Sequence, residues 1–459
     1  MLSYEVMASA GTGNERDGRA YGVVVCGGGP AGTGLIVCAA RDGRLRRLLT
    51  RGVCVVEQGD RLGAGSLGHY RITANTRGVS FLSGLDAAEP RELFRDALAT
   101  TAAQALRRRS FVFPPLPLVG SYLERLGADV ERLLATHPAC TVARRTTVRA
   151  VELLAGGGVR VRTESADSAH ATSVVARRAV LAMGGREPAA LETLRLLPGL
   201  TLERYRGKLC HASALIDDRI GVTRRLVQAV RETRSVVVVG GSHSAWSAAW
   251  TLLHDPSFRG PGGEAPAITV LHRSALRFYY ASAAKARAAG YAFDETSDVC
   301  PLTGAVHRHG GLRADAHSLA RSALAPGRGA SPVSVIRLVD DPDVRRNAER
   351  ELDGAGLVVA AVGYRPRLPR LSGTDGLPLE LAVSESGVVV TPRAQVVAAN
   401  GRVVPELFAY GLGAGLSAEA ELAAEPSYTG RVDAVRLYQN EVGRIVLDSL
   451  LAGDALVRS

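Results

Sequence analysis

Two stretches of the chain share one pattern, in which a short apolar run leads through glycines into a helix of small residues. The first is GVVVCGGGPAGTG at residues 22–34, and the second is SVVVVGGSHSAWSAAW at residues 235–250. Each is followed by another apolar run, GVCVVEQG at 52–59 and AITVL at 267–271. Uninterrupted apolar runs are typical of strands buried on both faces of a parallel sheet. The pattern therefore predicts two strand–helix–strand units.

The remaining elements follow from the same reading. Helices are expected at about 90–108 and 119–136, separated by FVFPPLPL, where the prolines disfavour helix. Strands are expected over 141–183, with a hairpin at glycines 156–158, and again at 356–363 and 404–411, before a final helix from about Val432. We predict an α/β protein with two Rossmann-like dinucleotide-binding domains, the second inserted in the first. The expected ranges are a flexible tail at 1–19, the first domain at 20–230 and 366–459, and the second at 231–365.

Composition fits a globular protein. The 459 residues are 46% hydrophobic and 22% charged, which can fill a sizeable core. No apolar run reaches the roughly 18 residues that span a membrane. The N-terminus lacks a basic segment followed by an apolar one, so no secretion signal is expected. These features favour a cytoplasmic protein with no membrane association.

The formal charge of +11 raises the question of a nucleic-acid partner. All but two of the 56 basic residues are arginine, spread over the whole chain without interleaved aromatic residues. No nucleic-acid partner is therefore expected, although the positive field favours a phosphate-bearing ligand. None of the six cysteines is spaced C-x-x-C, so all are expected to be reduced, with no redox dithiol and no metal site.

The first glycine-rich segment has the full dinucleotide-binding pattern. The first glycine permits a tight turn, the second lets a pyrophosphate approach the backbone, and the third lets helix and strand pack closely. The pyrophosphate then meets the N-terminus of the helix, where free N–H groups favour an anion. A carboxylate ends the next strand, where it accepts hydrogen bonds from ribose hydroxyls. The predicted contact residues are Gly27, Gly28, Gly29, Pro30, Ala31, Gly32, Glu57 and Gln58.

The second segment matches the dinucleotide-binding pattern less closely, because a serine takes the place of the second glycine. No acid ends the following strand; Arg273 stands there instead. A guanidinium binds a 2′-phosphate that a carboxylate would repel, so this position favours NADPH over NADH. The alternative is a solvent-facing arginine in an arginine-rich chain. Predicted contacts are Gly240, Gly241, Ser242, His243 and Ser244, with His243 expected to be a loop residue without a catalytic role.

This order of elements resembles the flavoprotein monooxygenases with two dinucleotide-binding domains, above all the group that N-hydroxylates amines such as ornithine and lysine. The resemblance rests on VVVCGGGPAG, VLAMGG, VVVVGGSHSA, VVAAVGYRPR and LFAYGLGAGL, which span most of residues 22–447. It implies FAD in the first domain and NADPH in the second. One departure is that Gly411-Leu412-Gly413 lacks the acid that bonds the ribityl chain in many reductases. The resemblance adds to the cofactor contacts Gly184, Gly363, Tyr364, Gly411 and Gly413.

The activity implied is that of a monooxygenase, in which NADPH reduces FAD and O2 forms a flavin hydroperoxide that hydroxylates a small amine or amino acid. Such chemistry needs a water-excluding pocket with hydrogen-bond donors. The loop 63–81 follows Glu57, and its Asn75 and His69 are the catalytic candidates; a polar surface loop is the alternative. Two other functions remain open: an NAD(P)H:acceptor flavin reductase that does not oxygenate, and a nucleotide-binding protein without turnover.

Overall fold

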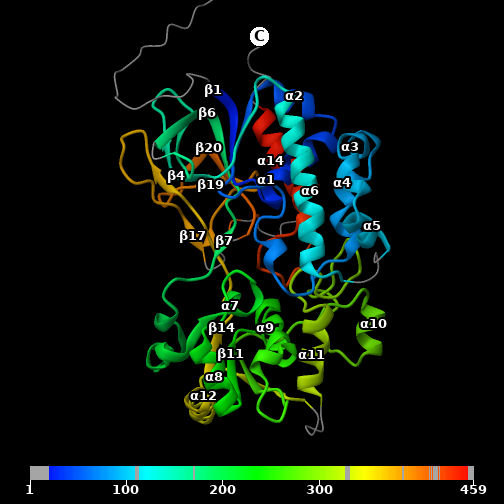
Figure 1. The fold of residues 1–459 in the computed structure, drawn as a ribbon, viewed down its shortest axis with the longest axis vertical. Helices are drawn as coiled ribbons and strands as arrows, with labels where there is room; N and C mark the ends of the chain where they lie inside the picture. The colour runs from blue at the N-terminus through cyan, green and yellow to red at the C-terminus, as the bar shows by residue number, and fades with distance from the viewer. Residues whose placement is uncertain are drawn as a thin grey trace, which may run out of the picture.

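Two separate sheets organise the chain, one in each lobe of an elongated molecule (Figure 1). This computed structural model describes residues 20–108, 113–168, 171–325, 331–384, 387–412, 414, 416, 422 and 424–452. The expected tail at 1–19 and the predicted contact Gly413 lie outside the described residues. The N-terminal and C-terminal parts of the chain share the upper lobe, and the middle of the chain forms the lower one (Figure 1).

The sheet of the upper lobe contains the first predicted unit. β1 (Ala20–Cys26) lies parallel to β2 (Val53–Val56) on one side and to β6 (Ala171–Leu181) on the other. β20 (Val403–Ala409) pairs in parallel with the last residues of β6. At their carboxyl ends the strands therefore stand in the order β2, β1, β6, β20. The predicted hairpin is confirmed as β4 (Thr146–Leu153) and β5 (Val159–Ser165), while β3 (Thr141–Ala143) and β16 (Arg370–Ser372) lie at the two edges.

Helices pack against the upper sheet through α1 (Pro30–Arg41), whose side chains are almost all buried. The long α6 (Leu116–Ala135) and the C-terminal α14 (Glu441–Leu451) lie beside α1 (Figure 1). The proline-rich segment is not wholly outside helix, because α6 already begins at Leu116. Pro117 is tolerated there because the N–H groups of a first helical turn have no partner within the helix.

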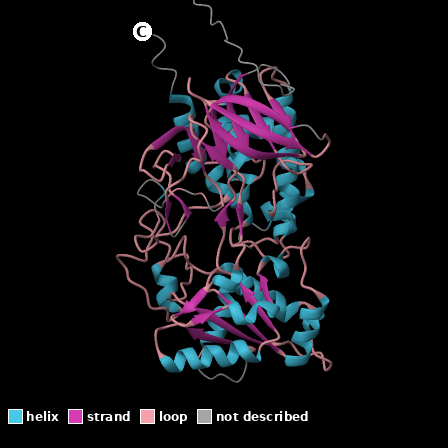
Figure 2. Cartoon of the chain, turned by 90° about the vertical axis from the view of Figure 1, so that its left-hand side faces the viewer, coloured by secondary structure: helices cyan, strands magenta, loops and turns pink. Residues whose placement is uncertain are grey.

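The sheet of the lower lobe is entirely parallel, in the order β10, β14, β11, β12, β13. Figure 2 shows these strands as one layer with helices beside them. The second predicted unit is confirmed as β11, α9 and β12, and Trp246 of α9 is fully buried in this core. The bounds are β10 (Leu209–His211), β11 (Ser235–Val239), α9 (His243–His254), β12 (Ala267–His272), α11 (Ala314–Leu324), β13 (Val333–Arg337), α12 (Pro342–Gly354) and β14 (Leu357–Ala360).

The lower lobe begins earlier in the chain than the expected boundary at residue 231. β10 already belongs to its sheet, and Leu202 and Tyr205 are buried against Val237 of β11. Three-residue strands such as β10 carry too little periodicity to be assigned from sequence. The chain crosses between the lobes where β7 (Gly185–Arg186) pairs antiparallel with β15 (Arg365–Pro366). The expected boundary at 365/366 falls within β15.

Two observations bear on the expectations from composition. No disulfide bond links any of the six cysteines, all of which lie in the described part of the chain. Across the described ranges, no helix combines the length and the apolar character that crossing a bilayer requires.

Candidate active site

The loop between β1 and α1 has the geometry that the first glycine pattern predicts. Gly27 has a positive φ of 109°, and a Cβ placed there would lie 2.4 Å from the carbonyl oxygen of Ala182. A Cβ at Gly32 would lie 2.0 Å from the carbonyl oxygen of Gly27. A Cβ at Gly29, by contrast, would meet only Cα of Gly65, at 3.7 Å. Packing of the protein therefore demands glycine at 27 and 32, whereas the space beside Gly29 is left for another molecule.

Glu57 is fixed at the end of β2. Its Oε2 accepts a hydrogen bond from the backbone N–H of Gly28 at 2.7 Å, and its Oε1 accepts one from Gly59 at 2.7 Å. A carboxylate has about four acceptor sites, so two remain for ribose hydroxyls. The neighbouring Gln58 accepts a hydrogen bond through Oε1 from Nη1 of Arg367 at 3.2 Å. The acid end of the predicted dinucleotide site is thus held in place before any ligand binds.

A cavity of about 750 Å³ extends from this loop toward the lower lobe. Its size matches sites for drug-sized ligands, which occupy roughly 300–1,000 Å³. Most of the predicted contact residues share it, including both catalytic candidates. Those that line it are Gly27, Gly29, Pro30, Ala31, Glu57, Gln58, His69, Asn75, Gly184, His243, Ser244, Tyr364 and Gly411.

The lower lobe reaches the same cavity through the start of α9. Gly240 has a φ of 139°, and a Cβ there would lie 2.3 Å from the carbonyl oxygen of Ala361, so the second turn also requires glycine. Ser242 is the N-cap residue, and its hydroxyl makes no capping hydrogen bond. The next residues, His243 and Ser244, line the cavity. The N-termini of α1 and α9 therefore both face one space, and each favours an anion.

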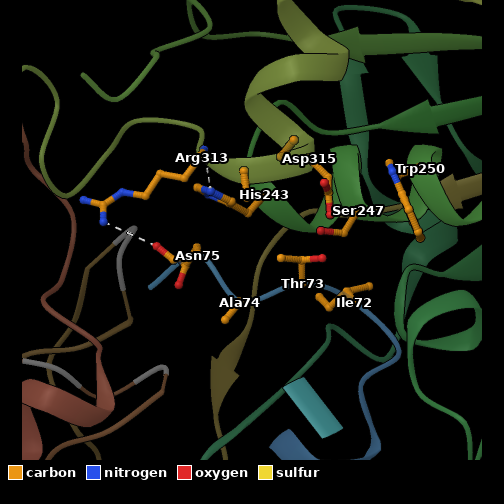
Figure 3. Close-up of a pocket in the computed structure, with 11 residues that line it drawn as sticks. Ile72, Thr73, Ala74, Asn75, His243, Ser247, Trp250, Arg313 and Asp315 are labelled. Carbon is orange, nitrogen blue, oxygen red and sulfur yellow. Dashed lines mark hydrogen bonds between the residues drawn. The ribbon is translucent and has the colours of Figure 1, made fainter. Parts of the chain in front are cut away.

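His243 is not the loop residue that the sequence indicated, because it is the first residue of α9. Its Nε2 accepts a hydrogen bond from the backbone N–H of Arg313 at 2.9 Å (Figure 3). Burial, and to a smaller extent the nearby Arg313 guanidinium, lowers the pKa of His243 to about 4. The ring is therefore neutral near pH 7 and carries its proton on Nδ1.

The two catalytic candidates occupy different surroundings. The carbonyl oxygen of Asn75 accepts a hydrogen bond from Nη1 of Arg313 at 3.3 Å, which joins the upper lobe to the loop before α11 (Figure 3). The Arg313 guanidinium also lies 3.9 Å from the ring centroid of Tyr279. His69 instead lies at the cavity wall with Nδ1 3.2 Å from Oδ1 of Asp218. Asn75 is therefore placed where the lobes meet, and His69 is paired with an acid.

The remaining predicted residues lie outside the cavity lining. Gly28 and Gly32 pack against protein atoms in the first turn, Gly28 against Leu62 and Gly32 against Gly27. Gly363, with a φ of 85°, precedes Tyr364. Arg273 is exposed just beyond β12, where its carbonyl oxygen accepts a hydrogen bond from Nε of Arg337 at 3.4 Å. This position is compatible with a ribose phosphate and equally with the alternative of a solvent-facing arginine. Gly240, Gly241 and Ser242 form the turn before α9.

Several cavity residues were missed by sequence reasoning. They are Tyr70, whose hydroxyl interacts with that of Tyr364, together with Asp433 and Tyr438 from the segment that leads into the C-terminal helices. Burial raises the pKa of both Tyr70 and Tyr364. These residues follow no spaced pattern, since folding brings them together from distant segments. The one signal was an acid at the start of the expected final helix.

Comparison with known proteins identifies the family. No protein-family model matches the sequence. The chain is 38% identical over 448 residues to the CMP-5'-(3-aminopropyl)phosphonate hydroxylase of Streptomyces rubellomurinus, covering 95% of this chain and 98% of that protein. It belongs to the family of that hydroxylase. The expectation of an oxidoreductase of the hydroxylating class is therefore confirmed.

Solved structures of low sequence identity share the fold of this hydroxylase family member. The cadaverine monooxygenase DfoA of Erwinia amylovora, bound to FAD, matches with a TM-score of 0.57 at 15% identity, covering 94% of each chain. The ornithine N-hydroxylase KtzI of Kutzneria sp. 744, holding reduced FAD, NADP+ and L-ornithine, matches with a TM-score of 0.52 at 16% identity, covering 94% of this chain and 99% of that one. The expected fold and the expected resemblance to N-hydroxylating monooxygenases are confirmed.

Proposed function

We propose that this protein is an FAD-dependent, NADPH-consuming monooxygenase that hydroxylates the amine nitrogen of a small aminoalkyl phosphonate carried on a nucleotide. One observation carries the proposal: a single cavity of about 750 Å³ is lined both by the glycine turn of the upper lobe and by the start of α9 in the lower lobe. The family supplies the substrate class, because the relative with 38% identity acts on CMP-5'-(3-aminopropyl)phosphonate. O2 is the co-substrate that monooxygenation requires.

The residues of the upper lobe fit FAD. Open space beside Gly29 admits the pyrophosphate at the N-terminus of α1, and Glu57 at the end of β2 accepts from the adenosine ribose. Gly184 and Gly411 lie at the ends of β6 and β20, on the side of β1 away from Glu57. The strand order therefore directs the flavin half of the dinucleotide toward Gly184 and Gly411.

The residues of the lower lobe fit NADPH. The uncommitted hydroxyl of Ser242 and the first N–H groups of α9 would hold its pyrophosphate, and Arg273 would hold the 2′-phosphate. When both cofactors are bound, they supply the hydride and the O2-activating flavin on which hydroxylation depends. The neutral ring of His243 adds no charge to this space.

The contact between the lobes contributes to excluding water. Arg313 donates through its backbone to His243 and through its guanidinium to the carbonyl oxygen of Asn75, so one residue joins α9 to the upper lobe (Figure 3). A protected site is necessary because activated oxygen species are lost to water when the pocket is open. We assign to Asn75 the role of a neutral hydrogen-bonding group at the wall of this site.

The proposal is tested by steady-state turnover of the FAD-loaded protein with NADPH and O2. CMP-5'-(3-aminopropyl)phosphonate, L-ornithine and cadaverine are compared, and hydroxylamine product, NADPH oxidised and H2O2 released are measured for each. The proposal predicts stoichiometric hydroxylamine with the nucleotide-linked amine and mostly H2O2 with the other two. NADPH oxidation that yields H2O2 alone with every amine, and that is fast with a quinone acceptor, would instead identify a flavin reductase.

A further inference from the structure

The acid that the sequence lacks after Gly411 is supplied from another segment. Asp433 lies two residues before α13 (Val435–Tyr438) and lines the same large cavity as Gly411. We propose that the Asp433 carboxyl group bonds the ribityl–flavin end of FAD. The inference rests on the proposed function, since it requires FAD in this cavity, and it adds a cofactor contact that the glycine patterns do not include.

A contact with Tyr438 helps to fix the position of Asp433. The hydroxyl of Tyr438 donates to Oδ1 of Asp433 at 3.3 Å. The Tyr438 ring packs edge-on against Tyr410, with centroids 5.6 Å apart, and the Tyr410 hydroxyl donates to the carbonyl oxygen of Ala31. This chain of contacts ties the carboxylate to the first turn of α1. Asp433 is therefore linked, through Tyr438 and Tyr410, to the helix whose N-terminus faces the expected pyrophosphate.

The end of β20 closes against the same turn. Gly411 has a φ of 102°, and a Cβ there would lie 3.2 Å from Cβ of Ala31. Gly411 and Ala31 both line the cavity together with Asp433. In place of an acid directly after Gly411, the cavity thus has one that comes 22 residues later in the chain, ahead of the C-terminal helices.

The orientation of FAD along the strand ends determines which part of FAD lies near Asp433. The carboxyl ends of the strands stand in the order β2, β1, β6, β20. Glu57 marks the adenosine side at β2, and Gly29 marks the pyrophosphate after β1. The opposite half of FAD, which is the ribityl chain and flavin, extends past β6 to β20. Asp433 is linked through Tyr438 to Tyr410, which directly follows β20, and this link assigns it to that end of the cavity.

The surroundings of Asp433 allow its carboxyl group to form hydrogen bonds with hydroxyl groups of a ligand. Its side chain is accessible because it faces the cavity, yet protein encloses it, and this burial raises the pKa of Asp433 to about 7. Arg431 and the Tyr438 hydroxyl act in the opposite direction and favour the carboxylate. A carboxyl group balanced in this way can accept hydrogen bonds from ribityl hydroxyls when ionised and donate one when neutral.

The test uses full-length protein from which FAD has been removed and to which it is added back. FAD dissociation constants are measured by fluorescence for wild type, Asp433→Ala, Asp433→Asn and a control, Asp448→Asn, which removes an exposed acid of α14. We expect at least tenfold weaker FAD binding for Asp433→Ala, a smaller loss for Asp433→Asn, and none for Asp448→Asn. The melting temperatures of the FAD-free proteins distinguish a folding defect from the loss of a contact to FAD. If Asp433→Ala does not fold, the FAD affinity of Asp433→Asn decides the question.

The reduction potential of bound flavin gives a second readout. Measured at pH 8.5, it should be more positive in Asp433→Asn than in wild type, because a negative charge near the flavin is removed. Unchanged FAD affinity and potential, with a raised KM for the amine, would overturn the inference and assign Asp433 to the substrate. Failure of the wild-type protein to bind FAD would overturn the proposed function together with this inference.

Discussion

The backbone N–H of Arg313 donates a hydrogen bond to Nε2 of His243 across 2.9 Å. The same arginine donates through its guanidinium to the carbonyl oxygen of Asn75. The start of α9, the loop before α11 and the loop after β2 therefore meet at one residue. In this arrangement the start of α9 and the loop that carries Asn75 belong to one connected site.

The pH dependence of the free energy of unfolding tests the role of His243 at this junction. Folded His243 has a pKa of about 4 against 6.5 for the free side chain, so the unfolded state binds more protons between these values. The contribution of neutral His243 to the free energy of unfolding is thus fully present above pH 6.5 and is lost as the pH falls toward 4. The loss between pH 7.5 and pH 5 amounts to roughly 2 kcal/mol. His243→Gln keeps an acceptor for Arg313 and removes the titration, so urea unfolding should show about that much less acid sensitivity. Equal pH dependence in both proteins would contradict the assignment of a buried neutral ring.

His243→Ala provides the companion measurement at pH 7.5. It leaves the Arg313 N–H without its acceptor, which costs about 1–3 kcal/mol when the group remains buried. Chemical denaturation should show that loss for His243→Ala and little change for His243→Gln. Similar losses for both substitutions would show that ring packing, and not the hydrogen bond, stabilises the junction.

Asn75→Ala is expected to lower the yield of hydroxylated product per NADPH oxidised. Only the side chain changes, so the backbone bond from Arg313 to the Asn75 carbonyl oxygen is kept. The missing amide removes a neutral hydrogen-bonding group from the cavity wall, and H2O2 should replace the lost product. The check is the ratio of hydroxylamine to H2O2, compared with Arg71→Ala in the same loop. An unaltered ratio would exclude Asn75 from this role.

The strands and glycine turns could be predicted because local sequence determines them. Continuous apolar runs identified β1, β2, β11 and β12, and the roles of Gly27 and Gly32 follow from close backbone contacts. Asp433 could not be found in this way, because its place in the cavity depends on how the C-terminal helices pack on α1. The early start of the lower lobe was missed for the same reason, since β10 is identifiable only by its pairing with β14.

Gly29→Val is expected to release FAD without unfolding the protein. A Cβ at this position meets only Cα of Gly65, at 3.7 Å, so the side chain would extend into the space assigned to the pyrophosphate. FAD affinity should fall at least tenfold while the melting temperature of the FAD-free protein is retained. Gly156→Val, in the open hairpin turn, is the matched control and should leave FAD affinity unchanged. A Gly29→Val protein that keeps full flavin occupancy would show that the site is assigned wrongly.

Arg273→Ala is expected to reduce the preference for NADPH over NADH. Charge-assisted hydrogen bonds contribute about 1.5–3 kcal/mol each, so KM for NADPH should rise roughly ten- to a hundredfold while KM for NADH stays nearly constant. Arg346→Ala, at an exposed arginine of α12 that pairs with Asp343, is the control and should change neither constant. Equal effects on the two cofactors, or none, would leave Arg273 as a surface charge.

The central claim is that this chain inserts an oxygen atom from O2 into an amine substrate. Purified protein is supplied with FAD, NADPH, CMP-5'-(3-aminopropyl)phosphonate and isotopically pure ¹⁸O2, and the product is weighed by mass spectrometry. We expect a hydroxylamine that carries one ¹⁸O atom, formed in near-equal amount to the NADPH oxidised. NADPH oxidation with the amine recovered unchanged and all the label in H2O2, or a product oxygen derived from water, would contradict it.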